Sequence, residues 1–247
     1  MATSSKDQNR RAVVEQMRRE QQSSERKRTF LIFGVVGLVA LVIIGLGAYP
    51  LVKDALAESK YDATGLEKIG VAASQAGCGD VKSSEATGSA DHRPESEALT
   101  YPDSPPASGS HYATWAQMDR KFYTEKDRPE LGYLVHNLEH GYNILWYDET
   151  IAEDADKVAD VEGIASKFPG TSDPENKFIA APWTSDDGDP FPEGTHIAMT
   201  HWSMGGTHGN DEGQRSIWQY CAEPSGEAVS TFVEDYPYTD SPEPNAG

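Results

Sequence analysis

LGYLVHNLEHGYNILWY, residues 131–147, is the stretch of sequence that decides the fold class of this chain. Its apolar residues at positions 131, 134, 135 and 138 follow the spacing of one helix face, which predicts a helix over residues 131–139. Gly141 is a favoured helix terminator, and the apolar and aromatic residues from Tyr142 to Tyr147 predict a strand. A helix that leads directly into such a strand indicates a fold that mixes both types of element.

The sequence on both sides of this stretch extends the pattern. Towards the C-terminus it predicts a helix over residues 150–168, strands over 177–183 and 196–202, and helices over 212–220 and 227–236. Towards the N-terminus, residues 82–112 are rich in Ser, Pro, Gly and Asp and predict a long loop. We therefore expect one mixed α+β domain over residues 78–236, followed by an acidic, disordered tail over residues 237–247.

A single N-terminal transmembrane helix is predicted over residues 29–52, where no charged residue occurs. This run matches the roughly 20 apolar residues that a helix needs to cross a bilayer. Residues 1–28 form a basic tail, which the positive-inside rule keeps in the cytoplasm. The alternative is a cleaved secretory signal ending near Ala55–Ala57, although the apolar run exceeds the roughly 7 to 15 residues of such signals. Either way, residues 53–77 are a linker and the domain is extracytoplasmic.

The exported part of the chain is strongly acidic. The whole chain has 21 Lys and Arg and 40 Asp and Glu, a formal net charge of −19. Eight of the basic and four of the acidic residues lie in the tail, which leaves the remainder with a net charge of −23. Such a surface repels nucleic acid, which we exclude as a partner. Apart from the membrane itself, the partners to expect are other membrane proteins of the cell envelope.

Cys78 and Cys221 are the two cysteines of the chain and lie near the two ends of the exported region. Thiols are not kept reduced outside the cytoplasm, so we predict a disulfide between them. Closing so long a loop stabilises the fold by on the order of 4 to 5 kcal/mol in the chain-entropy model. The alternative is a pair of thiolates that bind copper or zinc together with histidines.

The first group of candidate metal ligands is His136 and His140, with Glu139 between them. The two histidines are one turn apart on the predicted helix, so they share a face and can reach one metal ion. Glu139 would act as a base or orient one of the ligands. H-x-x-E-H is also the pattern of inverted zincin metallopeptidases, so a zinc hydrolase is an alternative. Against it, Gly141 ends the helix where that of a peptidase should continue.

The second group is Met199, His201 and Met204. Along a strand Met199 and His201 would face the same side, and the glycines after Met204 could turn it back towards them. Thioether and imidazole together favour copper, particularly Cu(I), with zinc as the alternative. Methionines that fill space in a core strand give the same pattern.

His111 ends a third candidate segment, PPASGSH over residues 105–111, which either orients a ligand or forms a structural turn. Together with HNLEHG over residues 136–141, this segment resembles the domain-of-unknown-function family numbered 3105. The resemblance implies an actinobacterial cell-envelope setting and makes His111, His136, Glu139 and His140 the natural site candidates. It implies no settled activity, metal or substrate.

These observations lead to one main hypothesis and two alternatives. The main hypothesis is a non-enzymatic, membrane-anchored, extracytoplasmic protein that binds copper, or alternatively zinc. The ligands that we expect are His111, His136, His140, Met199, His201 and Met204. The first alternative is a structural or accessory subunit of an envelope complex, with its histidines satisfied in the core. The second is the inverted-zincin-type hydrolase. No glycine-rich phosphate loop or G-x-S-x-G motif occurs, which argues against nucleotide binding and serine hydrolysis.

Overall fold

The computed structural model describes residues 61, 63–205 and 213–246. The chain divides into two units, Met1–Leu56 and Ala57–Gly247, and all the described residues belong to the second. No helix in this described part is both long and apolar enough to cross a membrane. The predicted basic tail, the predicted transmembrane helix and most of residues 53–62 lie outside the described residues.

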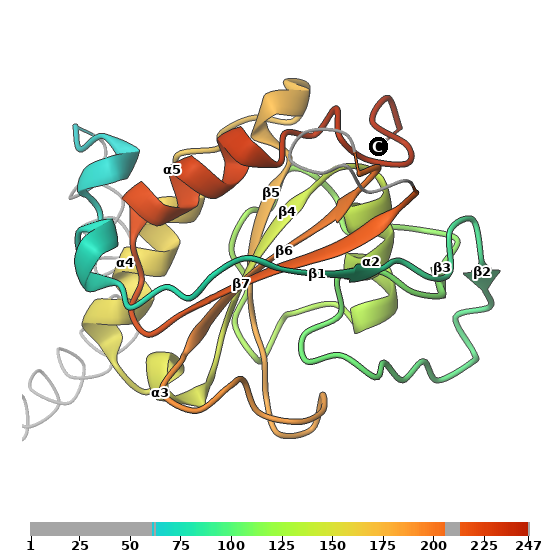
Figure 1. The fold of residues 1–247 in the computed structure, drawn as a ribbon, viewed down its shortest axis with the longest axis horizontal. Coiled ribbons are helices and arrows are strands. Elements are labelled where there is room, and N and C mark those ends of the chain that lie inside the picture. Colours follow the sequence, from blue (N-terminus) through green and yellow to red (C-terminus); the bar gives the residue numbers. More distant parts are fainter. Residues whose placement is uncertain (1–60, 62, 206–212, 247) are drawn as a thin grey trace, which may run out of the picture. The chain divides into compact units, whose positions relative to one another are not determined.

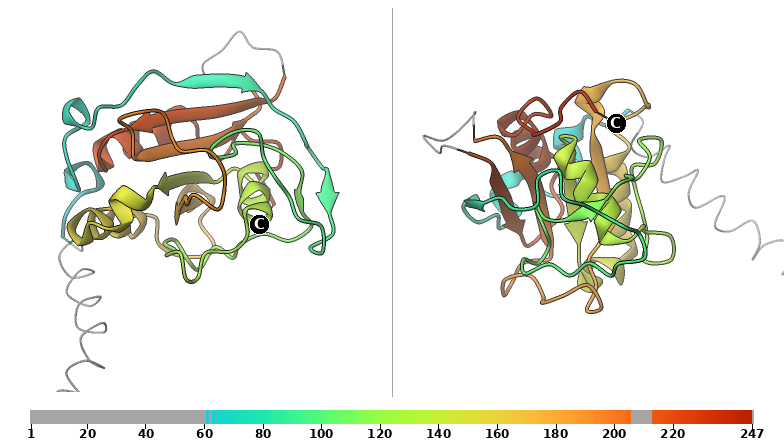
Figure 2. Two further views of the ribbon diagram at one scale, coloured as in Figure 1. Left: turned by 90° about the horizontal axis from the view of Figure 1, so that it is seen from below. Right: turned by 90° about the vertical axis from the view of Figure 1, so that its right-hand side faces the viewer.

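A five-stranded sheet with the order β1-β7-β6-β4-β5 forms the centre of the domain (Figure 1). Its strands are β1 (Lys82–Glu85), β4 (Asn143–Tyr147), β5 (Phe178–Pro182), β6 (Ile197–Ser203) and β7 (Arg215–Cys221). β4 and β5 are parallel, and all other neighbouring strands are antiparallel. Figure 2 shows β1 at the outer edge, beside β7. The predicted strands 142–147, 177–183 and 196–202 are confirmed as β4, β5 and β6.

Helices cover both faces of the sheet. α4 (Ala155–Ala165) and α5 (Gly226–Asp235) pack with one set of sheet residues, and α2 (Leu131–Glu139) packs with the alternate set. The alternation follows from the strand geometry, since successive side chains point to opposite faces. Leu145 therefore lies in the core with α4 and α5, whereas Trp146 lies in the core with α2. The predicted helix 131–139 is confirmed with the expected bounds.

The predicted disulfide is present between Cys78 and Cys221. It ties the segment that precedes β1 to the last residue of β7, which are 143 positions apart in sequence. Cys221 is buried in the core beneath α5. The link therefore fastens the outer edge of the sheet and the chain before it to the central strands, and it indicates an extracytoplasmic domain.

Two helix predictions need correction. The segment 212–220 was expected to be helical, but residues 215–221 form β7 between β6 and β1. Ile217 and Trp218 have high strand propensity, and pairing on both sides outweighs the local helical pattern. The predicted helix 150–168 is divided into α3 (Glu149–Ala152) and α4, because Asp154 accepts hydrogen bonds from the backbone N–H groups of the next turn and starts a new helix.

The domain also extends further at both ends than the predicted range 78–236. Tyr61 and Ile69 are buried in the core with α4 and α5, so the compact unit includes the greater part of the predicted linker. The described residues also form 3₁₀ helices at Leu66–Lys68, Ala73–Gln75 and Pro174–Asn176. At the other end, residues 237–246 pack against α2 and do not fray (Figures 1 and 2). Buried Asp240 and the backbone contact of Glu243 with α2 hold this tail in place.

Candidate metal centre

Three histidines and one glutamate converge beside α2 from three separate segments of the chain. His92 belongs to β2 (His92–Arg93), His111 to β3 (His111–Tyr112), and His136 and Glu139 to α2. The potential ligand atoms of these four residues all lie within 4.8 Å of one another. This set, called the inner cluster below, is the group of candidate ligands that the described residues bring together.

Two backbone arrangements create the inner cluster. β2 and β3 pair in parallel with His92 opposite His111, so these two rings lie side by side with centroids 4.8 Å apart. α2 then approaches β3 closely at Gly132, where an added Cβ would lie 2.6 Å from the ring of Tyr112. Glycine at this position therefore allows the helix to bring His136 and Glu139 up to the paired strands.

His111 and Glu139 form the buried part of the cluster. Nε2 of His111 lies 2.8 Å from Oε2 of Glu139, and both side chains are almost completely buried. Their contact is an ionic one, since neither atom has a well-aligned hydrogen-bond partner among the described residues, and Oε2 of Glu139 also lies 3.9 Å from Nε2 of His92. Buried polar atoms without hydrogen bonds are costly, so two of them facing each other indicate that a third species completes the site.

Hydrogen bonds to the backbone orient two of the rings. Nδ1–H of His111 donates to the carbonyl of Gly109 over 2.8 Å, and Nδ1–H of His136 donates to the carbonyl of Tyr112 over 2.6 Å. Because a carbonyl oxygen can only accept, these contacts fix the tautomer and leave Nε2 of each neutral ring with a free lone pair. Histidines that bind metal ions are typically oriented in this way.

Glu139 is held from the side opposite His111. Its Oε1 accepts the backbone N–H of Ala90 over 2.7 Å, while Oε2 faces the imidazoles. Ala90 has a positive φ of 54°, which turns this N–H inwards from the loop just before β2. The carboxylate therefore presents one oxygen to the cluster and uses the other to position the segment that carries His92.

Burial and charge set the protonation of these groups. Burial lowers the pKa of His136 and of the neighbouring His140, the latter to about 4. Burial also acts to lower the pKa of His111, but the carboxylate of Glu139 and the carbonyl of Gly109 outweigh it, and the pKa is raised. For Glu139 burial favours a higher pKa, yet contacts with His111 and Ala90 hold it below the usual value. Glu139 is therefore kept ionised and His136 neutral, which are the forms that bind a metal ion, whereas His111 would have to release its proton when an ion binds.

The cluster has one side open to solvent. The side chain of His92 is 41% exposed, whereas those of His111 and Glu139 are at most 1% exposed. Nε2 of His92 is 3.9 Å from Oε2 of Glu139. Because His92 lies at the surface and the other three candidate ligands are buried, a water molecule or another exchangeable ligand could reach a bound ion from the side of His92.

His140 lies next to the inner cluster but outside it. Its Nε2 is 2.9 Å from Nε2 of His136 and 3.6 Å from Oε2 of Glu243 in the C-terminal tail. Its Nδ1 is buried and has no hydrogen-bond partner among the described residues. The ring of Trp115 packs against it with a centroid distance of 4.8 Å.

The second predicted group of ligands lies elsewhere. Met199 is in the core with α4 and α5, and Met204 is 45% exposed at the end of β6. His201 is completely buried and its Nε2–H donates to the carbonyl of Asp240 over 2.9 Å. Trp202, the next residue along β6, contacts His111, so Met199 and His201 point to the other face of the sheet. The structure thus brings none of these three residues to the inner cluster.

His92 is the member of the inner cluster that sequence reasoning did not select. It sits in a polar loop with no second histidine at a helical or strand spacing. The pairing with His111 joins residues 19 positions apart through a strand of two residues. No local pattern in the sequence encodes that register.

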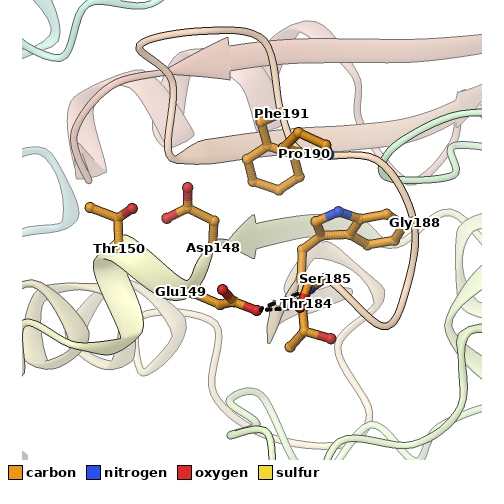
Figure 3. Close-up of a pocket in the computed structure, with 9 residues that line it drawn as sticks. Asp148, Glu149, Thr150, Thr184, Ser185, Gly188, Pro190 and Phe191 are labelled. Atoms are coloured by element: carbon orange, nitrogen blue, oxygen red, sulfur yellow. Dashed lines mark hydrogen bonds between the residues drawn. The ribbon is translucent and has the colours of Figure 1, made fainter.

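The described part of the chain also contains cavities, one beside the site and one away from it. One, of about 300 Å³, is lined by Arg93 and Ser110, the residues next to His92 and His111. The other, of about 280 Å³, is remote from the histidines of the inner cluster and lies between Asp148–Thr150 and the loop that carries Phe191 (Figure 3). In Figure 3 the Glu149 carboxylate is hydrogen-bonded to Ser185, and that of Asp148 is paired with His196 outside the view. The carboxylates of this second cavity are therefore already engaged within the protein.

Comparison with known proteins yields one extensive match. A family model described as "Protein of unknown function (DUF3105)" matches residues 92–247, which is more than half of the chain and includes the whole inner cluster. A second model, described as an inhibitor of host cell division protein domain, matches residues 8–62, less than a quarter of the chain. No curated protein and no solved structure matches the chain.

Proposed function

We propose that this chain, which belongs to the DUF3105 family of proteins of unknown function, is an extracytoplasmic protein that binds a divalent transition-metal ion in its inner cluster. The observation that carries the proposal is the pair of buried atoms Nε2 of His111 and Oε2 of Glu139, which face each other over 2.8 Å and have no well-aligned hydrogen bond among the described residues. A divalent cation between them would satisfy both lone pairs. The transmembrane anchor predicted over residues 29–52 would hold the domain at the outer face of the membrane.

The donor atoms guide the choice of metal. Three imidazole nitrogens and one carboxylate oxygen suit Cu(II) and Zn(II), and Cu(II) has the higher intrinsic affinity for such a set. Thioether ligands would be needed to favour Cu(I), and Met199 and Met204 lie away from the cluster. We therefore propose Cu(II) as the first candidate and Zn(II) as the second.

The two alternative functions receive less support. An inverted-zincin-type hydrolase needs His136 and His140 as the ligands, with Glu139 free to act as a base. Glu139 instead faces His111 and binds the loop at Ala90, and His140 lies outside the cluster. A purely structural role would require the buried imidazoles to be satisfied by protein groups, and among the described residues Nε2 of His111 and Nδ1 of His140 lack a hydrogen bond.

Metal content of the full chain tests the proposal. The chain, purified in detergent and loaded with Cu(II) or Zn(II), is freed of loosely held ions and analysed by mass spectrometry. We expect one ion per chain in the native protein and in a control, His196→Gln, whose histidine pairs with Asp148. We expect loss of the ion in the His92→Gln, His111→Gln double variant. No retained metal in the native protein, or equal retention in the double variant, would overturn the proposal.

A further inference from the structure

We infer that His140 and Glu243 form an outer metal position that shares His136 with the inner cluster, and that the ion passes through this position during uptake and release. The inference rests on the proposed function, because it describes how an ion reaches the same site. It assigns a role to His140, which the inner cluster does not use, and to a residue of the C-terminal tail.

The distances around His140 fit a second coordination position. Two ligands of one tetrahedral ion, with metal–ligand bonds of about 2.0–2.1 Å, lie roughly 3.3 Å apart. Nε2 of His140 is 2.9 Å from Nε2 of His136 and 3.6 Å from Oε2 of Glu243. These two separations bracket the expected one, so His140 lies at ligand distance from both His136 and Glu243.

The backbone fixes Glu243 where this role requires it. Its N–H donates to the carbonyl of Glu139 over 2.9 Å, so the tail is bound to the same helix that carries the inner ligands. Nζ of Lys177, itself buried, donates to the carbonyls of His140, Pro244 and Ala246 and so ties the residues that follow Glu243 to the end of α2. The carboxylate of Glu243 is therefore held beside His140 by contacts that do not involve its own oxygens.

Glu243, His140 and His136 are increasingly buried in that order, from the solvent towards the inner cluster. The side chain of Glu243 is 44% exposed, that of His140 is 2% exposed, and His136 belongs to the buried cluster. An ion attracted by the carboxylate would exchange its waters for His140 and then for His136. Because His136 has one free nitrogen, only one of the two positions can hold the ion at a time, which allows transfer without a second bound ion.

The native hydrogen bond between the two rings is compatible with this exchange. Nδ1–H of His136 is committed to the carbonyl of Tyr112, so Nε2–H of His140 is the donor between the rings. An ion on Nε2 of His136 displaces that donor, and His140 must then turn towards Glu243 or solvent. Among the described residues no hydrogen bond to Nδ1 of His140 competes with this rotation of the ring.

Uptake of Cu(II) by the full chain in detergent, followed by stopped-flow fluorescence, tests the inference. Trp115 is the reporter, since its ring lies against those of His136 and His140 and Cu(II) quenches indole. We expect Glu243→Gln and His140→Gln to bind one ion per chain at equilibrium but to take it up about tenfold more slowly. The control Glu193→Gln removes an equal charge from an exposed loop elsewhere and should leave the rate unchanged.

Unchanged uptake rates in both variants, with only His92→Gln slowing uptake, would show that the ion enters by the exposed histidine and would overturn the inference. A second measurement is independent of rates. In the His92→Gln, His111→Gln double variant, excess Cu(II) should give an electron paramagnetic resonance signal with two nitrogen ligands, lost on adding Glu243→Gln and His140→Gln. If the native chain bound no Cu(II) at all, that result would instead refute the proposed function, binding of Cu(II) by the inner cluster.

Discussion

Metal binding should raise the thermal stability of the domain by an amount that follows from its size. An ion present at about 100 times its dissociation constant stabilises the folded state by about 2.7 kcal/mol if it binds only that state. The folded unit Ala57–Gly247 unfolds with an entropy of about 0.4 kcal/mol/K, at roughly 2.1 cal/mol/K per residue. We therefore expect the midpoint of unfolding to rise by about 7 °C.

The assay is circular dichroism during heating of the full chain in detergent, with the disulfide kept oxidised. Samples contain a chelator, Zn(II) or Cu(II), and the His92→Gln, His111→Gln double variant serves as the matched comparison. Its midpoint should rise much less than that of the native protein at the same metal concentration, because the two imidazoles that complete the inner cluster are gone. A rise of the same size in the variant would mean that the ions act at other carboxylates of this acidic chain, and the reasoning from the cluster would fail.

Three further outcomes are expected. Replacing Cys78 and Cys221 by serine should cost about 2–5 kcal/mol of unfolding free energy in urea titrations, and a loss below the error of the titration would contradict the role of the disulfide. Gly141→Ala should destabilise more than Gly170→Ala by about 1–3 kcal/mol, since both have positive φ but only at Gly141 would the Cβ meet a backbone oxygen, that of Tyr238, at 2.4 Å. Metal affinity should fall steeply below about pH 6 in competition titrations, because protons compete for the imidazoles, and a flat profile from pH 7 to 5 would exclude histidine ligation.

The parts of the fold that the sequence predicts correctly are those that local periodicity controls. α2 and β4 are predictable from residues 131–147. The helix buries the apolar residues of one face, and every residue of the strand is buried, so both patterns are visible in the local sequence. β7 was missed because its strand character depends on pairing with β6 and β1, which lie elsewhere in the sequence. The tail after Tyr236 was expected to be disordered because its composition is polar, whereas the buried amine of Lys177 holds its backbone carbonyls.

The candidate site divides in the same way. His136 and Glu139 could be recognised from their helical spacing, and His111 was recognised through the family resemblance. His92 depends on a register between two strands of two residues, which leaves no trace in the local pattern. Strand alternation and residue types predict a copper site at Met199 and His201, and the two residues do share a face of β6, but that face lies away from the inner cluster. The sequence therefore indicates which residue types could bind a metal ion, but it does not show which residues from distant segments come together in the fold.

The paired strands β2 and β3 lie in a long segment between β1 and α2 that has very little hydrogen-bonded ladder of its own. Near the cluster it is attached to α2 by Glu139, which accepts the N–H of Ala90 and faces His111, and by His136, which donates to the carbonyl of Tyr112. An ion shared by His92, His111 and α2 would cross-link this segment to the helix. Local unfolding of the segment and release of the ion would then be a single event, so amide hydrogen exchange there should slow with metal concentration while exchange in β4 does not change.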